Sequence, residues 1–109
     1  MARVVAVVPD LMFASRVEAT LGAAGHEVEV ASAPQAADLG AADVVVADLG
    51  EIDTGSIADS GAPVLGFYSH VDVETRERAE SAGVDLVVPR SRMAREMPAL
   101  VESLLSRSG

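Results

Sequence analysis

The sequence of 109 residues contains no cysteine and no tryptophan, and its aromatic side chains are two phenylalanines and one tyrosine. Without cysteine, neither a disulfide framework nor a thiolate zinc site can form. With so few aromatic residues, the core must be built from valine, leucine, isoleucine and alanine. At this length a single domain, residues 1–109, is expected, and it can bury one hydrophobic core without additional crosslinks.

Long hydrophobic runs and an excess of positive charge are also missing. No apolar run approaches the roughly 20 residues that a membrane-spanning helix requires. The apolar run Val4 to Val8 is too short for the core of a signal peptide, and no cleavage pattern follows it. The net charge of −9 makes nucleic acid and anionic membranes unsuitable partners. The sequence therefore predicts a cytoplasmic protein that binds neither nucleic acid nor membrane.

Five short valine-rich segments predict β-strands. Three of them are nearly continuous in apolar residues, which is typical of strands covered on both faces. The segment EVEV (27–30) alternates instead, so it is expected at an edge of the sheet with one face in water. The five segments are RVVAVV (3–8), HEVEVA (26–31), DVVVA (43–47), PVLGFY (63–68) and DLVV (85–88).

Helical patterns lie between these strands. The first places Leu11, Ala14, Val17 and Leu21 near one stripe, and either glycine of residues 22–25 can end it. Three further helices are predicted: 32–40 with Ser32 as N-cap, Pro34 in the first turn and Gly40 as stop; 71–83 with Asp72 as N-cap; and 97–107 with Pro98 near the first turn. The segment between the third and fourth strands supports at most one or two turns around 56–59, and RSRMAR (90–95) reads as a basic loop.

Strands that alternate with helices predict a parallel sheet with helices on both faces and right-handed crossovers. In such sheets, ligands bind outside the carboxyl ends of the strands. The polar residues predicted at this edge are Asp10, Asp48, Ser69, His70, Asp72 and Arg90. A polar edge also explains why the apolar strand 43–47 continues into Asp48, whose charge would be costly to bury without a partner.

The segments resemble the receiver domains of bacterial two-component response regulators. AAGHEVEVAS is similar to the family's turn into its second strand, ADVVVADL to its third strand, APVLGFYSH to its fourth, and AGVDLVVPRS to the segment before its active-site lysine. The resemblance covers nearly the whole chain. It implies an α/β flavodoxin-like fold, a doubly wound five-stranded parallel sheet in the order 2-1-3-4-5 with helices on both faces and a short third helix. It places Asp48 in the phosphoacceptor position.

Other positions of the receiver site differ in this chain. The acidic pair that holds magnesium in the family corresponds to residues 8–9, a valine and a proline, with Asp10 one residue later. The hydroxyl residue that ends the family's fourth strand corresponds to Tyr68, with Ser69 next to it, and the family's lysine corresponds to Arg90. Phosphoryl transfer to a carboxylate requires a divalent cation. The resemblance therefore implies a degenerate receiver, for which no cofactor is expected and magnesium is doubtful.

Three functions follow from these features. The first is a stand-alone, non-enzymatic receiver-like signalling module that contacts a protein partner, a kinase or an output protein. The family commonly uses the face of its fourth helix, fifth strand and fifth helix for partners and homodimers, here roughly residues 72–107. The second is a small-ligand or metal-binding domain that uses Asp10, Asp48, His70, Asp72 and Arg90, although a helix cap at Asp72 and a loop histidine at His70 need no metal. The third is a phosphorelay in which Asp48 is phosphorylated and Asp10 substitutes as a ligand. Without phosphate, Arg90 can pair with Asp48.

Overall fold

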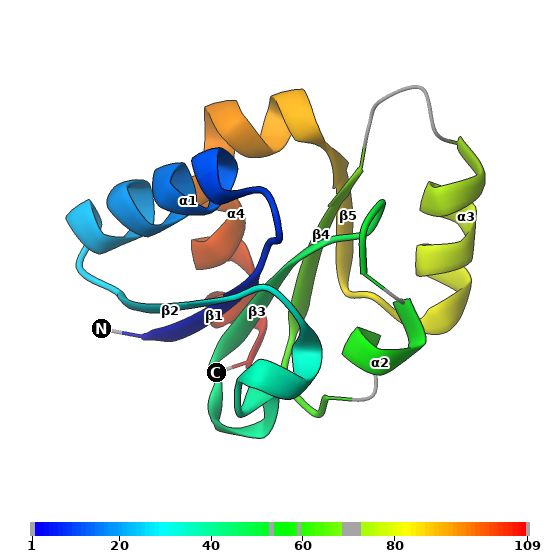
Figure 1. The fold of residues 1–109 in the computed structure, drawn as a ribbon, viewed down its shortest axis with the longest axis horizontal. Helices are drawn as coiled ribbons and strands as arrows, with labels where there is room; N and C mark the ends of the chain where they lie inside the picture. Colours follow the sequence, from blue (N-terminus) through cyan, green and yellow to red (C-terminus); the bar gives the residue numbers. More distant parts are fainter. Residues whose placement is uncertain (1, 53, 59, 69–72, 109) are drawn as a thin grey trace.

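Five parallel strands form one sheet in the order β2-β1-β3-β4-β5, which confirms the predicted fold class (Figure 1). The computed structural model of the protein describes residues 2–52, 54–58, 60–68 and 73–108. The strands are β1 (Arg3–Val7), β2 (Glu27–Ala31), β3 (Val44–Asp48), β4 (Val64–Tyr68) and β5 (Leu86–Pro89). The helices are α1 (Leu11–Ala23), α2 (Thr54–Ala58), α3 (Val73–Ala82) and α4 (Arg90–Ser108).

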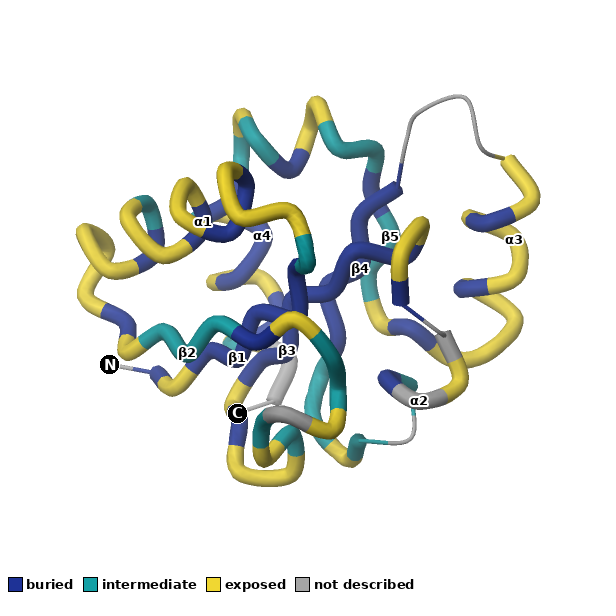
Figure 2. Tube along the Cα trace, viewed as in Figure 1, coloured by how far each residue is buried: buried dark blue, intermediate teal, exposed yellow. Residues whose placement is uncertain are grey.

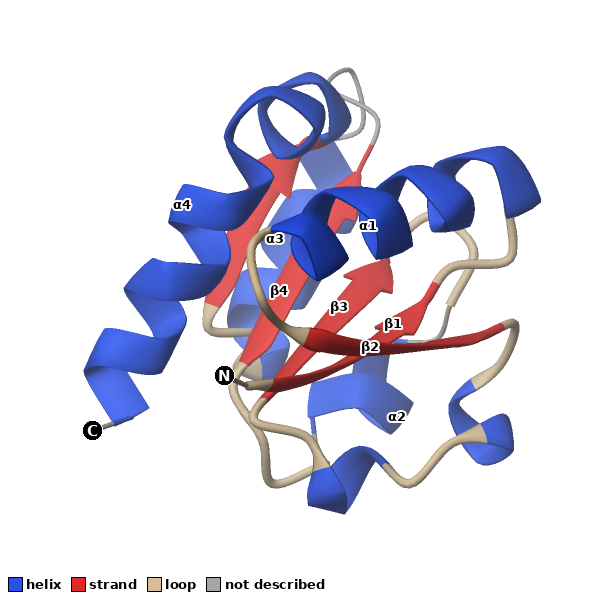
Figure 3. Cartoon of the chain, turned by 90° about the vertical axis from the view of Figure 1, so that its left-hand side faces the viewer, coloured by secondary structure: helices blue, strands red, loops and turns tan. Residues whose placement is uncertain are grey.

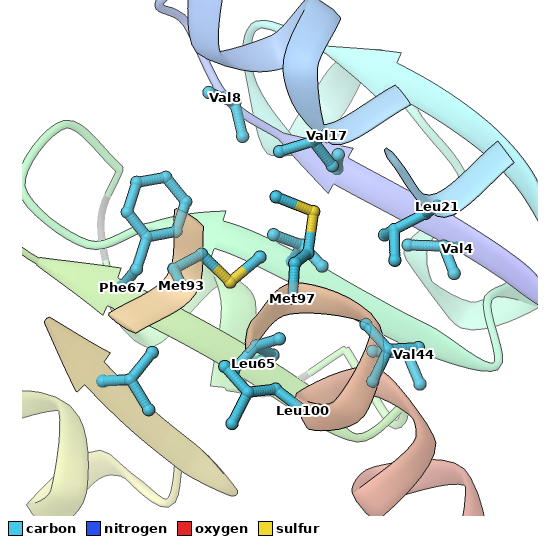
Figure 4. Packing of buried hydrophobic residues seen from close by; sticks show 14 of the residues in the cluster. Val4, Val8, Val17, Leu21, Val44, Leu65, Phe67, Met93, Met97 and Leu100 are labelled. Atoms are coloured by element: carbon cyan, nitrogen blue, oxygen red, sulfur yellow. The ribbon is translucent and has the colours of Figure 1, made fainter. Parts of the chain in front are cut away.

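The helices cover both faces of the sheet, α1 and α4 on one side and α2 and α3 on the other (Figure 3). The buried strands run through the middle of the molecule, between the helices (Figure 2). On the α1–α4 side, Val17 and Leu21 of α1 pack with Met97 and Leu100 of α4 over Leu65 (Figure 4). Because each central strand feeds a core on both faces, its sequence is a continuous apolar run. In the described part of the chain, no helix is long and apolar enough to cross a membrane.

The edge strand β2 is partly exposed to solvent, as its alternating sequence predicts. Val28 and Val30 pack against the α1–α4 core, whereas Glu27 is exposed and Glu29 pairs with Arg3 at 2.7 Å. Along its opposite face, β2 is less covered than the central strands, because the crossover from β2 to β3 carries two 3-10 turns and no α-helix.

The prediction of a helix over residues 32–40 is wrong. The segment forms two 3-10 turns, Pro34–Ala36 and Leu39–Ala41, and no side chain caps either turn. The predicted N-cap Ser32 lies one residue before the observed cap position, Ala33. A short helix needs an apolar face to hold it on the sheet. Here Ala37 and Leu39 pack against the core, partly buried, and this is too little apolar surface to dock a helix.

Two other helices differ from prediction in detail. Leu11 is 77% exposed, and Phe13 takes its place on the buried stripe with Ala14, Val17 and Leu21. At about 100° per residue, Leu11 does not lie on the helix face that these four residues share. The buried stripe therefore begins at Phe13, two residues later than predicted. Of the two candidate stop glycines, Gly25 has the positive φ, 96°, that follows the helix end.

The last helix starts earlier than predicted. Residues 90–95, predicted as a loop, are its first segment, which is anchored by the fully buried Met93. The backbone leaves helical geometry at Glu96 (φ −121°, ψ 18°), and Pro98 follows within the second segment. Because proline cannot donate to the preceding turn, it sits at the start of a helical segment, where the predicted helix 97–107 placed it.

The close approach of Leu49 to β4 generates a stability prediction. A Cβ added to Gly66 would lie 2.6 Å from Cδ1 and 2.8 Å from Cγ of Leu49. Gly66→Ala is therefore expected to lower the free energy of unfolding by about 1–3 kcal/mol, the usual cost of overpacking a core. Urea unfolding followed by circular dichroism measures this loss.

The matched control is Gly22→Ala, because a Cβ at this helical glycine meets no atom within 4 Å. That change is expected to be neutral or to stabilise the protein by up to about 1 kcal/mol. Equal effects of the two substitutions would contradict the steric explanation.

Candidate functional site

Four of the predicted site residues lie where strands reach the same edge of the sheet, here called the rim. Asp10 is the N-cap of α1 just after β1, Asp48 is the last residue of β3, Tyr68 is the last residue of β4, and Arg90 opens α4 directly after β5. In Figure 1 the start of α4 lies beside the start of α1. The rim thus gathers three charged groups from three separate strand ends.

Asp10 has a structural task and an ionic partner. Its Oδ1 accepts hydrogen bonds from the backbone N–H groups of Met12 (3.0 Å) and Phe13 (3.3 Å), which caps α1. Its Oδ2 accepts a hydrogen bond of 2.8 Å from Nη2 of Arg90. That hydrogen bond, followed by the bond from Phe13, lowers the pKa of the Asp10 carboxyl below its ordinary value. Both oxygens of the carboxylate are therefore occupied.

Arg90 is held by aromatic rings as well as by Asp10. Its Cζ lies 4.3 Å from the ring centroid of Phe13 and 5.9 Å from that of Phe67. The two rings contact each other with centroids 4.9 Å apart. A guanidinium over an aromatic face gains from the negative ring quadrupole. The structure thus pairs Arg90 with Asp10, rather than with Asp48 as the sequence analysis considered.

Asp48 is nearly buried, with 6% of its surface exposed. Its Oδ1 accepts a hydrogen bond from the backbone N–H of Gly50 (3.1 Å), and its carbonyl accepts bonds from Glu51 and Ile52. Burial raises the pKa of the Asp48 carboxyl, and the Gly50 N–H and the charge of Arg90 oppose this rise. The carboxylate that ends the apolar strand therefore shapes the turn that leaves the sheet.

The remaining predicted site residues are Tyr68, Ser69, His70 and Asp72. Tyr68 is buried at the end of β4. Ser69, His70 and Asp72 lie outside the described residues, so the metal set that included His70 and Asp72 stays a prediction. Within the described ranges, no group of three histidine, cysteine or acidic side chains lies close enough to hold a metal ion.

The described donor set does not fit the magnesium ion that the receiver resemblance implies. Magnesium demands octahedral oxygen ligands and is usually bound by one or two carboxylates. Asp10 directs both oxygens to other donors, and Asp48 directs one to Gly50. The positive charge of Arg90 beside Asp10 would in addition repel a second cation.

A surface cavity of about 350 Å³ opens in front of the ion pair. Its lining is Asp10, Met12, Phe13, Arg16 and Arg90. The sequence analysis missed Met12, Phe13 and Arg16 as neighbours of the site, because only the phase of α1 shows which side of the helix each residue occupies. Phe13, Val17 and Leu21 are spaced by four residues, as apolar residues on one helix face are, and this spacing could have identified Phe13.

The substitution Asp10→Asn keeps a side-chain oxygen for the helix cap but removes the negative charge. Because the folded pKa of Asp10 is lowered, chiefly by Arg90, the wild-type carboxylate stabilises the fold above the pKa of an unfolded aspartate. This stability is lost as the pH falls through the folded pKa. Asp10→Asn is therefore expected to be less stable than wild type at neutral pH and equally stable in acid, in urea unfolding at several pH values. Asp38→Asn, at an exposed carboxylate, serves as the control.

Asp48→Asn is expected to act in the opposite direction. Since burial raises the folded pKa of Asp48, the ionised group opposes folding at neutral pH, and wild type gains stability as the pH falls through that pKa. Asparagine is uncharged and keeps an acceptor for the Gly50 N–H. The variant is therefore expected to be more stable than wild type at neutral pH, with an advantage that shrinks in acid. A loss of stability at neutral pH would show that the Asp48 charge is well compensated.

Comparison with known proteins places this geometry in a fold family. No protein-family model matches the chain, and no curated protein matches it. Solved structures do. The receiver domain of the Francisella response regulator 1452 superposes with a TM-score of 0.84 at 18% identity, covering 100% of both chains. A CheY-like response regulator receiver domain protein from Methanospirillum hungatei gives 0.83 at 17% identity, covering 98% of this chain and 95% of that one.

A larger protein contains the same unit. NtrX from Brucella abortus, solved in complex with ADP, gives a TM-score of 0.84 at 20% identity. The match covers 98% of this chain, which spans 27% of the NtrX chain. Identities this low establish the fold and leave the chemistry of the rim to this chain's own residues. The chain has the fold of response-regulator receiver domains.

Proposed function

We propose that the protein is a cytoplasmic, non-enzymatic, receiver-like signalling module that acts through protein–protein contacts without phosphorylation of Asp48. The observation that carries the proposal is the ion pair between Asp10 and Arg90. It balances charge at the edge of the sheet where phosphorylation would otherwise bring in a divalent cation and a phosphoryl group.

The state of Asp48 supports the same function. A carboxylate that attacks a phosphodonor must be ionised and accessible. Asp48 is nearly buried, and its pKa is raised by that burial. One of its oxygens also accepts a hydrogen bond from Gly50. These features favour a structural carboxylate over a nucleophile, and phosphorelay activity at Asp48 is kept as the alternative that the experiment below tests.

The partner, by likeness to receivers, is a kinase or an output protein. The sequence analysis placed its contact on residues 72–107, which the structure divides among α3, β5 and α4. The large hydrophobic side chains exposed within the described ranges are Val73 at the start of α3 (54%), and Leu11 (77%) and Met12 (85%) at the start of α1. Contiguous exposed apolar patches mark contact sites, whereas single exposed apolar side chains are common on any protein surface. We take Val73 as the position to test on the predicted face, and the neighbouring pair Leu11 and Met12 as a second one.

The test compares partner binding by surface variants and by Asp48→Asn. Wild type, Asp48→Asn, Val73→Ser and Leu11→Ser/Met12→Ser are each tagged in the native cell, crosslinked and purified, and bound proteins are quantified by mass spectrometry. Asp48→Asn is expected to retain the wild-type partner, because the contact does not use the phosphorylated state. One of the two surface variants is expected to lose it, and Asp38→Asn serves as the surface control.

Loss of the partner in Asp48→Asn would favour the phosphorelay alternative. The same alternative predicts that magnesium with beryllofluoride, a phosphoryl mimic, shifts the amide NMR signals of Gly50, Met12 and Phe13 in the wild-type protein. Retention of the partner by all variants would place the contact elsewhere on the molecule.

A further inference from the structure

The three charged groups of the rim act on one another. The charge of Arg90 favours the ionised form of both Asp10 and Asp48. The charge of Asp10 in turn opposes ionisation of Asp48. Two carboxylates that sense each other as like charges require a cation nearby if both are to be ionised. The cation in contact with Asp10 is the side chain of Arg90, at 2.8 Å.

The position of that side chain is built into the fold. Arg90 directly follows β5, and its guanidinium contacts a carboxylate on the β1–α1 connection and two aromatic rings. Phe67 lies beside Asp48 and Val88 in the register of the sheet, so the ring is fixed by the central strands. Phe13 is fixed by the first turn of α1, which Asp10 itself caps. The guanidinium is therefore preorganised by three elements.

We infer that the Arg90 guanidinium is the resident cation of this rim and takes the place of a divalent metal ion. The inference goes beyond the proposed function and does not depend on the partner, since it concerns only the charge balance of Asp10 and Asp48. It has a specific consequence. Without the guanidinium, Oδ2 of Asp10 loses its donor and faces a cavity of about 350 Å³, which Asp10 lines together with Met12, Phe13 and Arg16. Because magnesium retains several waters and accepts one or two carboxylates, this altered rim is a weak site for a hydrated divalent cation.

The experiment measures whether magnesium stabilises the protein before and after the guanidinium is removed. Arg90→Met keeps an unbranched side chain against Phe13 but carries no charge. In wild type, magnesium chloride is expected to change Tm no more than sodium chloride of equal ionic strength. In Arg90→Met, Tm in EDTA is expected to be lower than in wild type, and magnesium at about ten times its Kd is expected to raise it by about 6 °C.

The matched control is Arg92→Met. Arg92 lies on the same segment of α4 and forms an ion pair with Glu96 (3.5 Å), away from Asp10 and Asp48. This variant is expected to show no specific response to magnesium. The double variant Asp10→Asn/Arg90→Met is expected to lose the response of Arg90→Met, because it lacks the carboxylate that lines the cavity. If Arg90→Met fails to fold, Arg90→Gln takes its place, and manganese broadening of the amide signals of Met12, Phe13 and Gly50 replaces Tm as the readout.

Two outcomes would overturn the inference. A wild-type protein that magnesium stabilises as strongly as Arg90→Met would show that the guanidinium and a metal ion do not compete for one place. An Arg90→Met protein that responds no more than Arg92→Met would show that the two carboxylates form no cation site. The inference and the proposed function share the Asp10–Arg90 ion pair as an observation, but partner binding is measured separately by the crosslinking comparison, so failure here is distinguishable from loss of the partner contact.

Discussion

A guanidinium fixed between a carboxylate and two aromatic rings determines the geometry of the rim. Arg90 connects the β1–α1 turn through Asp10, the centre of the sheet through Phe67, and the start of α4 through its own backbone. These segments are distant in sequence, and the ion pair itself joins residues 80 positions apart. An exposed ion pair alone contributes little to stability. Here the pair is combined with a helix cap and an aromatic stack, so the three contacts fix one arrangement together.

The same contacts explain the shape of the last helix. In the first segment of α4, Arg90 lies toward α1, and the buried Met93 anchors the segment in the core between α1 and the sheet. The chain then leaves helical geometry at Glu96 and resumes with Pro98, after which Leu100, Val101 and Leu104 return to the core. Arg92 and Arg95 both pair with Glu96 at this bend. The three arginines of the basic run are thus all in ion pairs, two with Glu96 of the same helix and one with Asp10.

The sequence predicts the fold well because each strand can be recognised from its own pattern of apolar residues. Valine-rich runs such as residues 43–47 identify central strands, and the alternation in 27–30 identifies an edge. Elements that depend on tertiary contacts were less predictable. The segment 32–40 has a helical sequence pattern but too little apolar surface to dock as a helix. The first segment of α4 has the sequence pattern of a loop, because its burial rests on Met93, with Ala94 partly buried beside it.

The candidate site was likewise predictable where it depends on the strands and unpredictable where it depends on tertiary contacts. Spacing along the chain placed Asp10, Asp48 and Arg90 at one edge of the sheet, since every parallel strand delivers its carboxyl end there. It could not decide which carboxylate Arg90 contacts, because that depends on the direction of side chains. Leu11 was assigned to the buried stripe for the same reason: a shift of two residues along a helix moves a side chain to another face. The aromatic support from Phe13 follows only once that phase is known.

A cation that is part of the chain has consequences that a bound metal does not. The occupancy of a metal site depends on the concentration of the ion. The net charge of a phosphorylated carboxylate changes whenever the phosphoryl group is added or removed. A tethered guanidinium is always present, and it is charged throughout the physiological pH range. On the proposed reading, the charge balance at Asp10 and Asp48 is therefore constant, and the rim cannot report a phosphorylation event by changing that balance. What remains variable is whether a partner is bound. A receiver fold with this rim is suited to signalling by the presence or absence of a contact.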